Sequence, residues 1–433
     1  MKTVKRFIFL IALALLVFPM LQAKFHVIIS KPLSGVFENA PPPVFSIGSW
    51  FRGTYQEQAA KNFDDSLGFK SDFVRLYNQI NFSLFDQVNA KKIICGKENY
   101  LYSDQYLYAY AGKDFAGKAV LDGRINELKN LQDILWDKHK IFLLVVLCPD
   151  KPTFYPDYIP VRFLSTGKKL TNAEYIARRC KETGVHLIDF NPWFLAMKDT
   201  ARYPLYPKTG VHWSFYGAYF AADSLARYLS VNTDFTIPRL VLDSLSKSKT
   251  PLAEDNDMGA TLNLIWDIPC PEMAYPKFHG EYNPKPRKAS ALFVGDSFYW
   301  NWFNSGMIKT LFENDDFWYY SKDVYPGSRN KPVSVSDINI HHEIKKQNII
   351  VLIQVNGAYG NIGYDFSKLA LSAFDSANSK LIRIENNLRN NPGASDWIKK
   401  KAEKLHVKFE DQLRTDALFL LDQEEDKQQT KDK

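Results

Sequence analysis

Residues 291–298 read Ala-Leu-Phe-Val-Gly-Asp-Ser-Phe, an apolar run that ends at Gly295 and is followed at once by an aspartate and a serine. Short continuous apolar runs are typical of buried parallel strands, and ligands of open α/β sheets bind beyond the carboxyl ends of such strands. We therefore expect Ser297 to lie where a reacting atom can reach it. A serine is a poor nucleophile until a base removes its proton, and His212, just before a predicted helix, is the best candidate for that base.

The rest of the chain alternates between buried strands and amphipathic helices. This alternation predicts an α/β fold with a mostly parallel sheet and helices on both of its faces. A glycine turn within residues 93–102 predicts a hairpin ahead of this core, residues 54–90 have helical spacing, and residues 232–288 are expected to be irregular. The predicted strands are 141–147, 185–190, 291–294 and 349–355, and the predicted helices are 123–138, 172–183 and 216–229.

The N-terminus combines basic residues with one long apolar run. Three of the first six residues are basic, and the apolar stretch at 7–23 follows them, a pattern that directs export across the inner membrane of a bacterium-like cell. A membrane-spanning helix needs about 20 apolar residues, so this run is slightly short. We expect residues 1–23 to be either a signal peptide cleaved near Ala23 or a retained inner-membrane anchor. A proline-rich linker at 24–60 would then lead to a folded periplasmic domain.

Composition argues against nucleic-acid binding and against a metal site. The net charge of +7 is small for 433 residues and no arginine-rich block accompanies it, so nucleic-acid binding is not expected. The aromatic content of 15% suits carbohydrate surfaces, but it suits cores and interfaces equally. The cysteines show no paired spacing, so we expect no metal site, and no cofactor is implied. They are either buried thiols or one or two disulfides, and Cys148, at the end of an apolar strand, favours the thiol. The four are Cys95, Cys148, Cys180 and Cys270.

Four segments, in the same order along the chain, resemble one family. They are residues 96–102, residues 149–156, the pair His212 and Trp213, and residues 295–298. Together they are similar to the AlgX/AlgJ-like family of exported alginate O-acetyltransferases. The resemblance implies an SGNH-hydrolase-like three-layer α/β/α sandwich, in the circularly permuted order that places the histidine before the serine. It also implies a catalytic domain at residues 61–366.

One position departs from the family pattern. The family has an aspartate two residues before the histidine, where this chain has Gly210. An imidazole that lacks its carboxylate partner loses control of its tautomer and stabilisation of its charged form. Either another acid orients His212, and the candidates are Asp189, Asp255 and Asp257, or the site is a weaker Ser–His dyad, or it is inactive. If one of them orients His212, the substitution Gly210→Asp is expected to change the rate only modestly.

The residues of the serine turn have expected roles of their own. Asp296 is expected to brace the turn that Gly295 opens, and the backbone N–H of Ser297 is the expected oxyanion donor. Asn356, just beyond the strand at 349–355, is either a second polar contact there or an ordinary strand-end residue. The alternative for Ser297 itself is a helix N-cap, and the alternative for His212 is a structural role.

Two more residues are candidates for substrate binding. Lys151 follows the strand at 141–147 and would reach substrate if it faces the same crevice. Its alternative, an exposed loop lysine, is the favoured one. Trp213 is the second candidate because it adjoins His212.

The resemblance implies a reaction and partners. Ser297 would carry an acetyl group as an ester, and His212 would help to pass it to a hydroxyl of an exported polysaccharide. A membrane-bound O-acyltransferase would supply the acetyl group. Two other functions remain open, namely a carbohydrate esterase that gives the acyl group to water and a carbohydrate-binding scaffold with a degenerate site.

The C-terminal part lies outside the resemblance. Residues 367–421 are expected to form a helical extension, within which a basic helix at 395–405 carries Trp397 and Ile398. Packing on the catalytic domain is its default explanation, and contact with anionic headgroups or a membrane partner is the alternative. Residues 422–433 are highly charged and are expected to be disordered.

Overall fold

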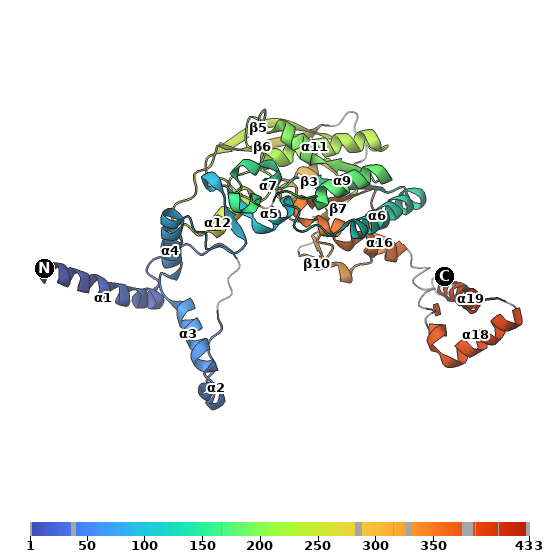
Figure 1. The fold of residues 1–433 in the computed structure, drawn as a ribbon, viewed down its shortest axis with the longest axis horizontal. Helices are drawn as coiled ribbons and strands as arrows, with labels where there is room; N and C mark the ends of the chain where they lie inside the picture. Colours follow the sequence, from blue (N-terminus) through green and yellow to red (C-terminus); the bar gives the residue numbers. More distant parts are fainter. Residues whose placement is uncertain are drawn as a thin grey trace.

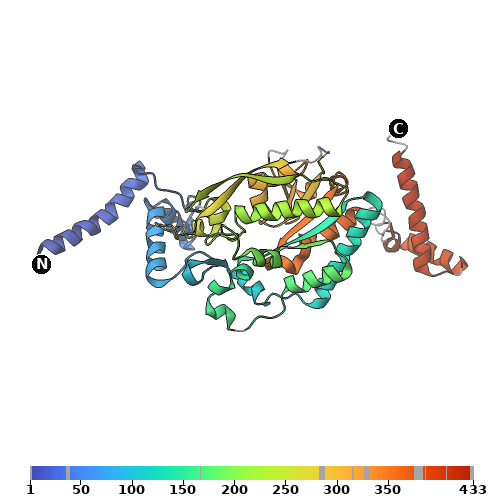
Figure 2. The ribbon, with the colours of Figure 1, turned by 90° about the horizontal axis from the view of Figure 1, so that it is seen from above.

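The computed structural model of the chain describes residues 2–35, 40–165, 167–281, 288–314, 316–325, 331–374, 384–385, 387–405 and 407–429. Figure 1 shows a layered central body with the N-terminal helices at one end and the last two helices at the other. Figure 2 shows the same arrangement from above.

The body is built around one sheet. Among the described residues this sheet has seven strands in the order β10-β9-β8-β7-β11-β3-β4, and the five from β8 to β4 are parallel. Strands β9 and β10 join antiparallel at the edge. The strands are β3 (Phe142–Cys148), β4 (Leu187–Asp189), β7 (Ala291–Gly295), β8 (Phe317–Tyr319), β9 (Asp323–Tyr325), β10 (Val333–Ser334) and β11 (Ile349–Val355).

Helices cover both faces of the sheet. Side chains of β3 alternate between two cores, with Leu144 and Val146 on one face and Leu143 and Val145 on the other, because successive side chains of a strand point to opposite faces. One face is covered by α10 (Phe190–Met197), α11 (Phe215–Asn232), α13 (Tyr299–Ser305) and α14 (Met307–Leu311). The other is covered by α6 (Lys118–His139), α9 (Asn172–Thr183), α15 (Ile340–Lys345) and α16 (Phe366–Phe374). The predicted three-layer α/β/α sandwich is confirmed.

Two smaller antiparallel pairs flank the sheet. The predicted hairpin is confirmed as β1 (Ile93–Cys95) paired with β2 (Leu101–Ser103). The expectation of an irregular segment at 232–288 is wrong, because β5 (Arg239–Ser248) and β6 (Met273–Glu281) pair there with a bulge after Leu242. Most of their side chains are exposed or half-buried, so they lack the continuous apolar run by which a buried strand is recognised. Short helices complete the connections: α5 (Asp104–Tyr110), α7 (Lys151–Phe154), α8 (Val161–Leu164) and α12 (Asp257–Thr261).

The N-terminal segment begins with a helix long and apolar enough to cross a membrane. Helix α1 (Lys2–Phe25) is 24 residues long and contains an 18-residue stretch with a mean hydropathy of 2.2. The expected extended linker at 24–60 is only partly extended, because α2 (Ile47–Phe51) and the start of α3 (Thr54–Ser66) lie within it. Ser46 caps α2 by accepting a hydrogen bond from the backbone N–H of Ser49, which stabilises a helix start that the prolines upstream obscure. Helix α4 (Lys70–Phe85) follows and leads into the body.

The C-terminal segment departs from expectation in three ways. Helix α16 packs Phe366 and Ala370 onto the sheet, so the layered domain continues past residue 366. Helix α18 (Pro392–Leu405) packs against α19 (Phe409–Gln429), and Figure 1 shows this pair set apart from the body rather than lying on it. Helix α19 also extends through residues 422–429, where a disordered tail was expected. Residues 430–433 of the expected tail lie outside the described residues.

Candidate active site

A tight turn after β7 presents Ser297. A side chain at Gly295 would place its Cβ 2.3 Å from the carbonyl oxygen of Ile353, so only glycine lets β7 end this close to β11. Asp296 then fixes the turn: its Oδ1 accepts from the backbone N–H of Phe298 at 2.9 Å, and its Oδ2 accepts from that of Val355 at 2.8 Å. Burial raises the pKa of Asp296, while these hydrogen bonds oppose the shift. These are the contacts that the expected bracing of the turn by Asp296 requires.

His212, which precedes α11, contacts Ser297. Its Nε2 atom lies 2.8 Å from Oγ of Ser297, which is hydrogen-bond distance. The histidine is held just ahead of α11, where Ser214 caps the helix by accepting from the backbone N–H of Gly217 at 2.9 Å. The two residues that the sequence singled out are therefore in contact at the carboxyl edge of the sheet, although their catalytic roles stay a prediction.

Asp257 completes a chain of three side chains. Its Oδ2 lies 2.8 Å from Nδ1 of His212, on the side of the ring away from the serine. Its Oδ1 accepts from the backbone N–H of Val211 at 2.8 Å and from that of Met258 at 2.6 Å. These two bonds fix the carboxylate at the start of α12, so the oxygen facing the histidine is held in place. An acid in this position can select the tautomer that leaves Nε2 free to take a proton.

The other two candidate acids lie elsewhere. Asp189 caps α10, where its Oδ1 accepts from the backbone N–H of Asn191 at 3.0 Å. Asp255 is fully buried and accepts from the backbone N–H of Phe215 at 3.3 Å, and burial raises its pKa well above the usual range. Among the described residues, Asp257 is the only one of the three whose carboxylate lies within 4 Å of a ring nitrogen of His212.

Gly210 lies where the backbone just ahead of Asp257 passes close to the segment that carries His212. An added Cβ would lie 2.6 Å from the carbonyl oxygen of Glu254 and 2.9 Å from the carbonyl carbon of Asp255. Both atoms belong to the backbone just ahead of Asp257, so an added Cβ could be accommodated only if that backbone moved. The expectation that Gly210→Asp would be mild is therefore wrong on steric grounds, because the new side chain would displace the segment that carries Asp257.

Trp213 and Lys151 are both buried, so neither is a surface contact for substrate. Trp213 is fully buried, and its Nε1 donates to the carbonyl oxygen of Phe298 at 3.1 Å, which ties the histidine segment to the serine turn. Lys151, expected in an exposed loop or at the crevice, is 1% exposed. Its Nζ donates to the carbonyl oxygens of Leu101 at 2.9 Å and Lys208 at 3.1 Å. Burial lowers the pKa of Lys151 to about 7, with Asp257 nearby acting in the opposite direction.

Asn356 does not support an oxyanion. Its side chain pairs with that of Asn191, and its Nδ2 also donates to Oγ1 of Thr153 at 3.2 Å. It therefore points toward β3 and β4 rather than toward β7. Strand order explains the error, because β11 lies between β7 and β3 and the residue after it can face either neighbour.

Tyr320 is a site residue that the sequence reading missed. It follows β8, and its backbone N–H donates to the carbonyl oxygen of Gly295 at 2.8 Å. Its hydroxyl lies near the side chain of Ser297, and burial raises the pKa of the phenol, which therefore stays protonated. Its φ of 51° is left-handed, a strained conformation for a tyrosine that often marks a functional position. The signal in the sequence is the short aromatic run Phe317-Trp318-Tyr319, which is a strand ending at the same edge as the serine.

The described residues contain neither a cluster of metal-ligating side chains nor a disulfide. Across the described residues, no group of three or more His, Cys, Asp or Glu side chains is placed to hold a metal ion. None of the four cysteines forms a disulfide, so of the two alternatives left open by their spacing the structure has the free thiols.

The backbone N–H of Ser297 donates to no acceptor in the described part of the chain, so it is available to an incoming ligand.

Comparison with known proteins supports the family resemblance. Residues 93–293 match the sequence model of the family described as the SGNH hydrolase-like domain of acetyltransferase AlgX. This match confirms the AlgX/AlgJ-like resemblance and the SGNH-hydrolase-like fold over that range. The matched range contains His212 and Asp257 and ends just before the serine turn. No curated protein matches the chain significantly.

The solved structures that the chain matches share little sequence with it. The O-acetyltransferase domain of Pseudomonas putida AlgJ is 14% identical over 66% of this chain and 99% of its own, with a TM-score of 0.43. Pseudomonas aeruginosa AlgX is 15% identical over 67% of this chain and 72% of its own, with a TM-score of 0.41. Bacillus cereus PatB1 is 12% identical over 63% of this chain and 99% of its own, with a TM-score of 0.42.

Proposed function

We propose that this protein is an O-acetyltransferase that moves acetyl groups onto a hydroxyl of an exported polysaccharide through an acyl-serine. The observation that carries the proposal is the continuous chain from Ser297 Oγ to His212 Nε2 at 2.8 Å and from His212 Nδ1 to Asp257 Oδ2 at 2.8 Å. Nucleophile, base and orienting acid in this order are the arrangement that acyl transfer through serine requires. The match of residues 93–293 to an acetyltransferase family supports acetyl as the acyl group.

In the first half of the reaction, Ser297 Oγ attacks the carbonyl carbon of an acetyl donor. Nε2 of His212 takes the serine proton as the new O–C bond forms, and Asp257 stabilises the resulting imidazolium. The developing oxyanion accepts from the backbone N–H of Ser297 and from the Tyr320 hydroxyl, which lies near the serine. The bond to the donor's leaving group then breaks, and His212 returns the proton to that group.

In the second half, a sugar hydroxyl takes the place of the leaving group. His212, neutral again, removes the hydroxyl proton as its oxygen attacks the acetyl carbon of the ester. Collapse of the second tetrahedral intermediate breaks the bond to Ser297 Oγ, and the proton passes from His212 to the serine. The products are an acetylated sugar and the free enzyme.

The location and partners follow from the N-terminal helix and the family resemblance. Helix α1 fits a signal or an anchor, so the folded domain would act on the periplasmic side of the inner membrane. Acetyl donors made in the cytoplasm must then cross the membrane, and a membrane-bound O-acyltransferase partner would deliver the group to Ser297.

The test follows the acetyl group from donor to acceptor. Full-length protein is mixed with p-nitrophenyl acetate, and intact-mass and peptide spectra are recorded with and without a soluble oligosaccharide. We expect one acetyl group on Ser297, no acetylation in Ser297→Ala, and acetylated sugar when the oligosaccharide is present. Release of acetate alone in the presence of acceptor would instead identify an esterase. A wild-type protein that never forms the acyl-serine would leave only the binding scaffold.

A further inference from the structure

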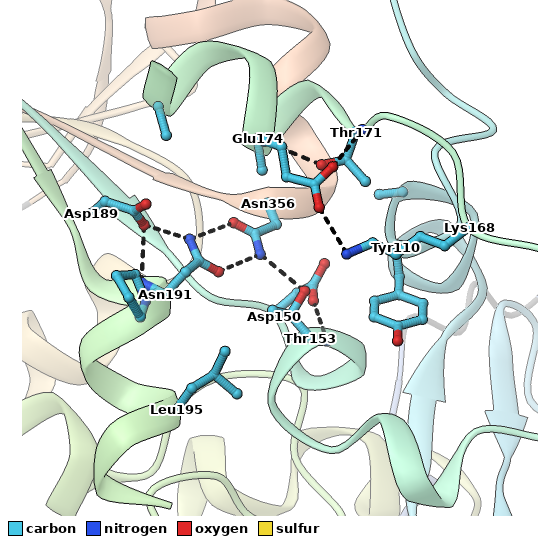
Figure 3. A pocket seen from close by; sticks show the side chains of 14 residues that line it. Tyr110, Asp150, Thr153, Lys168, Thr171, Glu174, Asp189, Asn191, Leu195 and Asn356 are labelled. Carbon is cyan, nitrogen blue, oxygen red and sulfur yellow. Dashed lines mark hydrogen bonds and ion pairs between the residues drawn. The ribbon is translucent and has the colours of Figure 1, made fainter. Parts of the chain in front are cut away.

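A pocket opens at the same edge of the sheet, on the side of β11 away from β7. It has a volume of about 340 Å³, within the range of small-ligand pockets. Its polar wall comes from residues that follow three neighbouring parallel strands, namely Asp150 after β3, Asn191 after β4 and Asn356 after β11. Figure 3 shows these side chains converging, with Asp150 in the middle of the view. The pocket plays no part in the proton transfers proposed above.

Asp150 brings an unused acceptor into this pocket. The residue is 0% exposed, and its Oδ1 accepts from the backbone N–H of Thr153 at 2.8 Å, which caps α7. Its Oδ2 has no hydrogen-bond partner within the part of the chain that the structure describes. Burial raises the pKa of Asp150 to about 6, so the group is mainly a carboxylate at neutral pH. A buried carboxylate oxygen without a partner is costly, and a ligand that donates a hydrogen bond to it would remove that cost.

The amides beside Asp150 have no donors left to offer. Both N–H groups of Asn191 are used, by Asp189 at 2.7 Å and by Asn356 Oδ1 at 3.1 Å. Both N–H groups of Asn356 are used as well, by Asn191 Oδ1 at 2.7 Å and by Thr153 at 3.2 Å. Their carbonyl oxygens keep a free lone pair each. The hydrogen-bonding capacity that remains on this wall is therefore that of acceptors, which favours a ligand rich in donors.

The charges of the pocket point the same way. Its titratable acids are Asp150, Asp189 and Glu174, against one ammonium, that of Lys168. That ammonium already pairs with Glu174 at 2.9 Å. The site is thus net acidic and would repel a carboxylate or phosphate. The remaining wall is apolar and includes the ring of Tyr110 and the side chain of Leu195, surfaces that suit the C–H face of a sugar ring.

We propose that this pocket binds one sugar ring that carries hydroxyl or amine donors and no carboxylate. Asp150 Oδ2 accepts a hydrogen bond from the sugar, and the carbonyl oxygens of Asn191 and Asn356 accept from neighbouring donors. The proposal rests on the proposed function, because it identifies this ring as a unit of the acceptor polymer held beside the acetylated serine. It narrows the acceptor to polysaccharides that are not built of uronic acids.

Binding is measured by isothermal titration calorimetry on the full-length protein carrying Ser297→Ala, so that no turnover occurs during the titration. Three probes of equal length are compared: a neutral hexose oligosaccharide, a chitosan oligosaccharide and a mannuronate oligosaccharide. We expect either or both of the first two to bind at least about tenfold more tightly than the mannuronate probe, and their order tells hydroxyl from ammonium recognition. Equal or tighter binding of mannuronate, or no binding of any probe, would overturn the proposal.

Two variants test whether the sugar probes bind in this pocket. Asp150→Asn keeps the cap of α7, since asparagine is an equally good N-cap, but it replaces the free oxygen by a donor. We expect it to weaken binding about tenfold, as loss of a hydrogen bond to a charged group does. Leu195→Trp fills the pocket from a position that is 42% exposed, so it should abolish binding while the fold is kept. Asp133→Asn, an exposed acid on α6 outside the pocket, is the matched control and should bind as the parent does.

The outcome is separable from that of the proposed function. Acyl-serine formation on the wild-type protein tests the chemistry and needs no sugar. If the acyl-serine forms but Asp150→Asn and Leu195→Trp bind the probes as tightly as the parent, the pocket assignment alone fails. If the probes bind and both variants weaken them while no acyl-serine ever forms, the proposed function fails and the sugar site stands.

Discussion

The Nδ1 atom of His212 lies 2.8 Å from Oδ2 of Asp257, a residue that begins a short helix well downstream of the histidine. The family pattern places the corresponding acid two residues before the histidine, on the same segment. In this chain the position two residues upstream is Gly210, and the acid arrives from a separate segment that crosses close above that glycine. The chain thus has glycine where the motif would place an acid, and Asp257 from another segment lies against His212 instead.

We expect Asp257→Asn to lower turnover by roughly 10³-fold or more, because the amide no longer selects the productive tautomer or stabilises the imidazolium. The backbone bonds to Val211 and Met258 reach Oδ1, which asparagine can keep, so the melting temperature should change little. Steady-state hydrolysis of p-nitrophenyl acetate measures the effect, with the exposed Asp267→Asn as the control. Turnover within a few-fold of wild type would rule out Asp257 as the orienting acid.

Restoring the family acid should harm this protein. In Gly210→Asp, and equally in Gly210→Ala, the new Cβ would collide with the backbone of Glu254 and Asp255, so we expect lower stability and loss of most turnover. Gly123→Ala is the control, because an added Cβ there meets nothing within 4 Å and alanine stabilises a helix by about 1 kcal/mol. Thermal unfolding and turnover are measured together. An active, stable Gly210→Asp protein would contradict the crossing of the two segments.

Tyr320→Phe removes one hydroxyl from the serine turn. If that hydroxyl stabilises the oxyanion, turnover should fall about 10²-fold, the usual effect of losing one oxyanion donor, while KM changes little. Tyr325→Phe, on β9, is the matched control because it removes a hydroxyl without touching Ser297. The split between kcat and KM is the measurement, and a loss confined to KM would place Tyr320 in substrate binding instead.

Lys151 should make the stability of the protein depend on pH. Burial lowers its pKa from 10.5 to about 7 in the folded state, so between these values the unfolded chain binds the additional proton. The free energy of unfolding therefore rises with pH across this window, by roughly 2 kcal/mol between pH 7 and 9. Below pH 7 the lysine is charged in both states and the full penalty of its burial remains.

Lys151→Met tests this dependence because methionine keeps most of the apolar stem. Denaturant unfolding of both proteins from pH 6 to pH 10 gives the difference in their free energies of unfolding. The wild type should gain relative to the variant as pH rises from 7. A difference that is constant with pH would show that Lys151 has an ordinary pKa.

We expect α1 to be retained as an anchor. An added Cβ at Gly68 would lie 2.2 Å from the carbonyl oxygen of Pro19, and the Gln22 side chain accepts from the backbone N–H of Ile28 at 3.1 Å. Both contacts tie the end of the helix to the segments that follow. The protein should stay with membranes in high salt, and deletion of residues 2–25 should release it. A mature N-terminus near Lys24 would show cleavage instead.

Local signals predicted much of the layered body. The start of α9 is an example: Thr171 Oγ1 accepts from the backbone N–H of Glu174 at 3.1 Å, and Glu174 accepts in return from that of Thr171. This reciprocal cap is written in four adjacent residues. Strands β3 and β11 are buried along their whole length, so their apolar runs were equally plain. In contrast, β5 and β6 are mostly exposed, and their contacts are with each other and with α11, which spacing along the chain does not reveal.

The sequence by itself determined that a serine follows one buried strand and that a histidine precedes a helix, because both facts depend on neighbours along the chain. It left open which of Asp189, Asp255 and Asp257 faces the histidine, and it misplaced Lys151, Trp213 and Asn356. Only the tertiary structure decided these. Which way a side chain points at the end of a strand depends on the order of strands in the sheet and on where distant loops cross, and neither is encoded in local spacing.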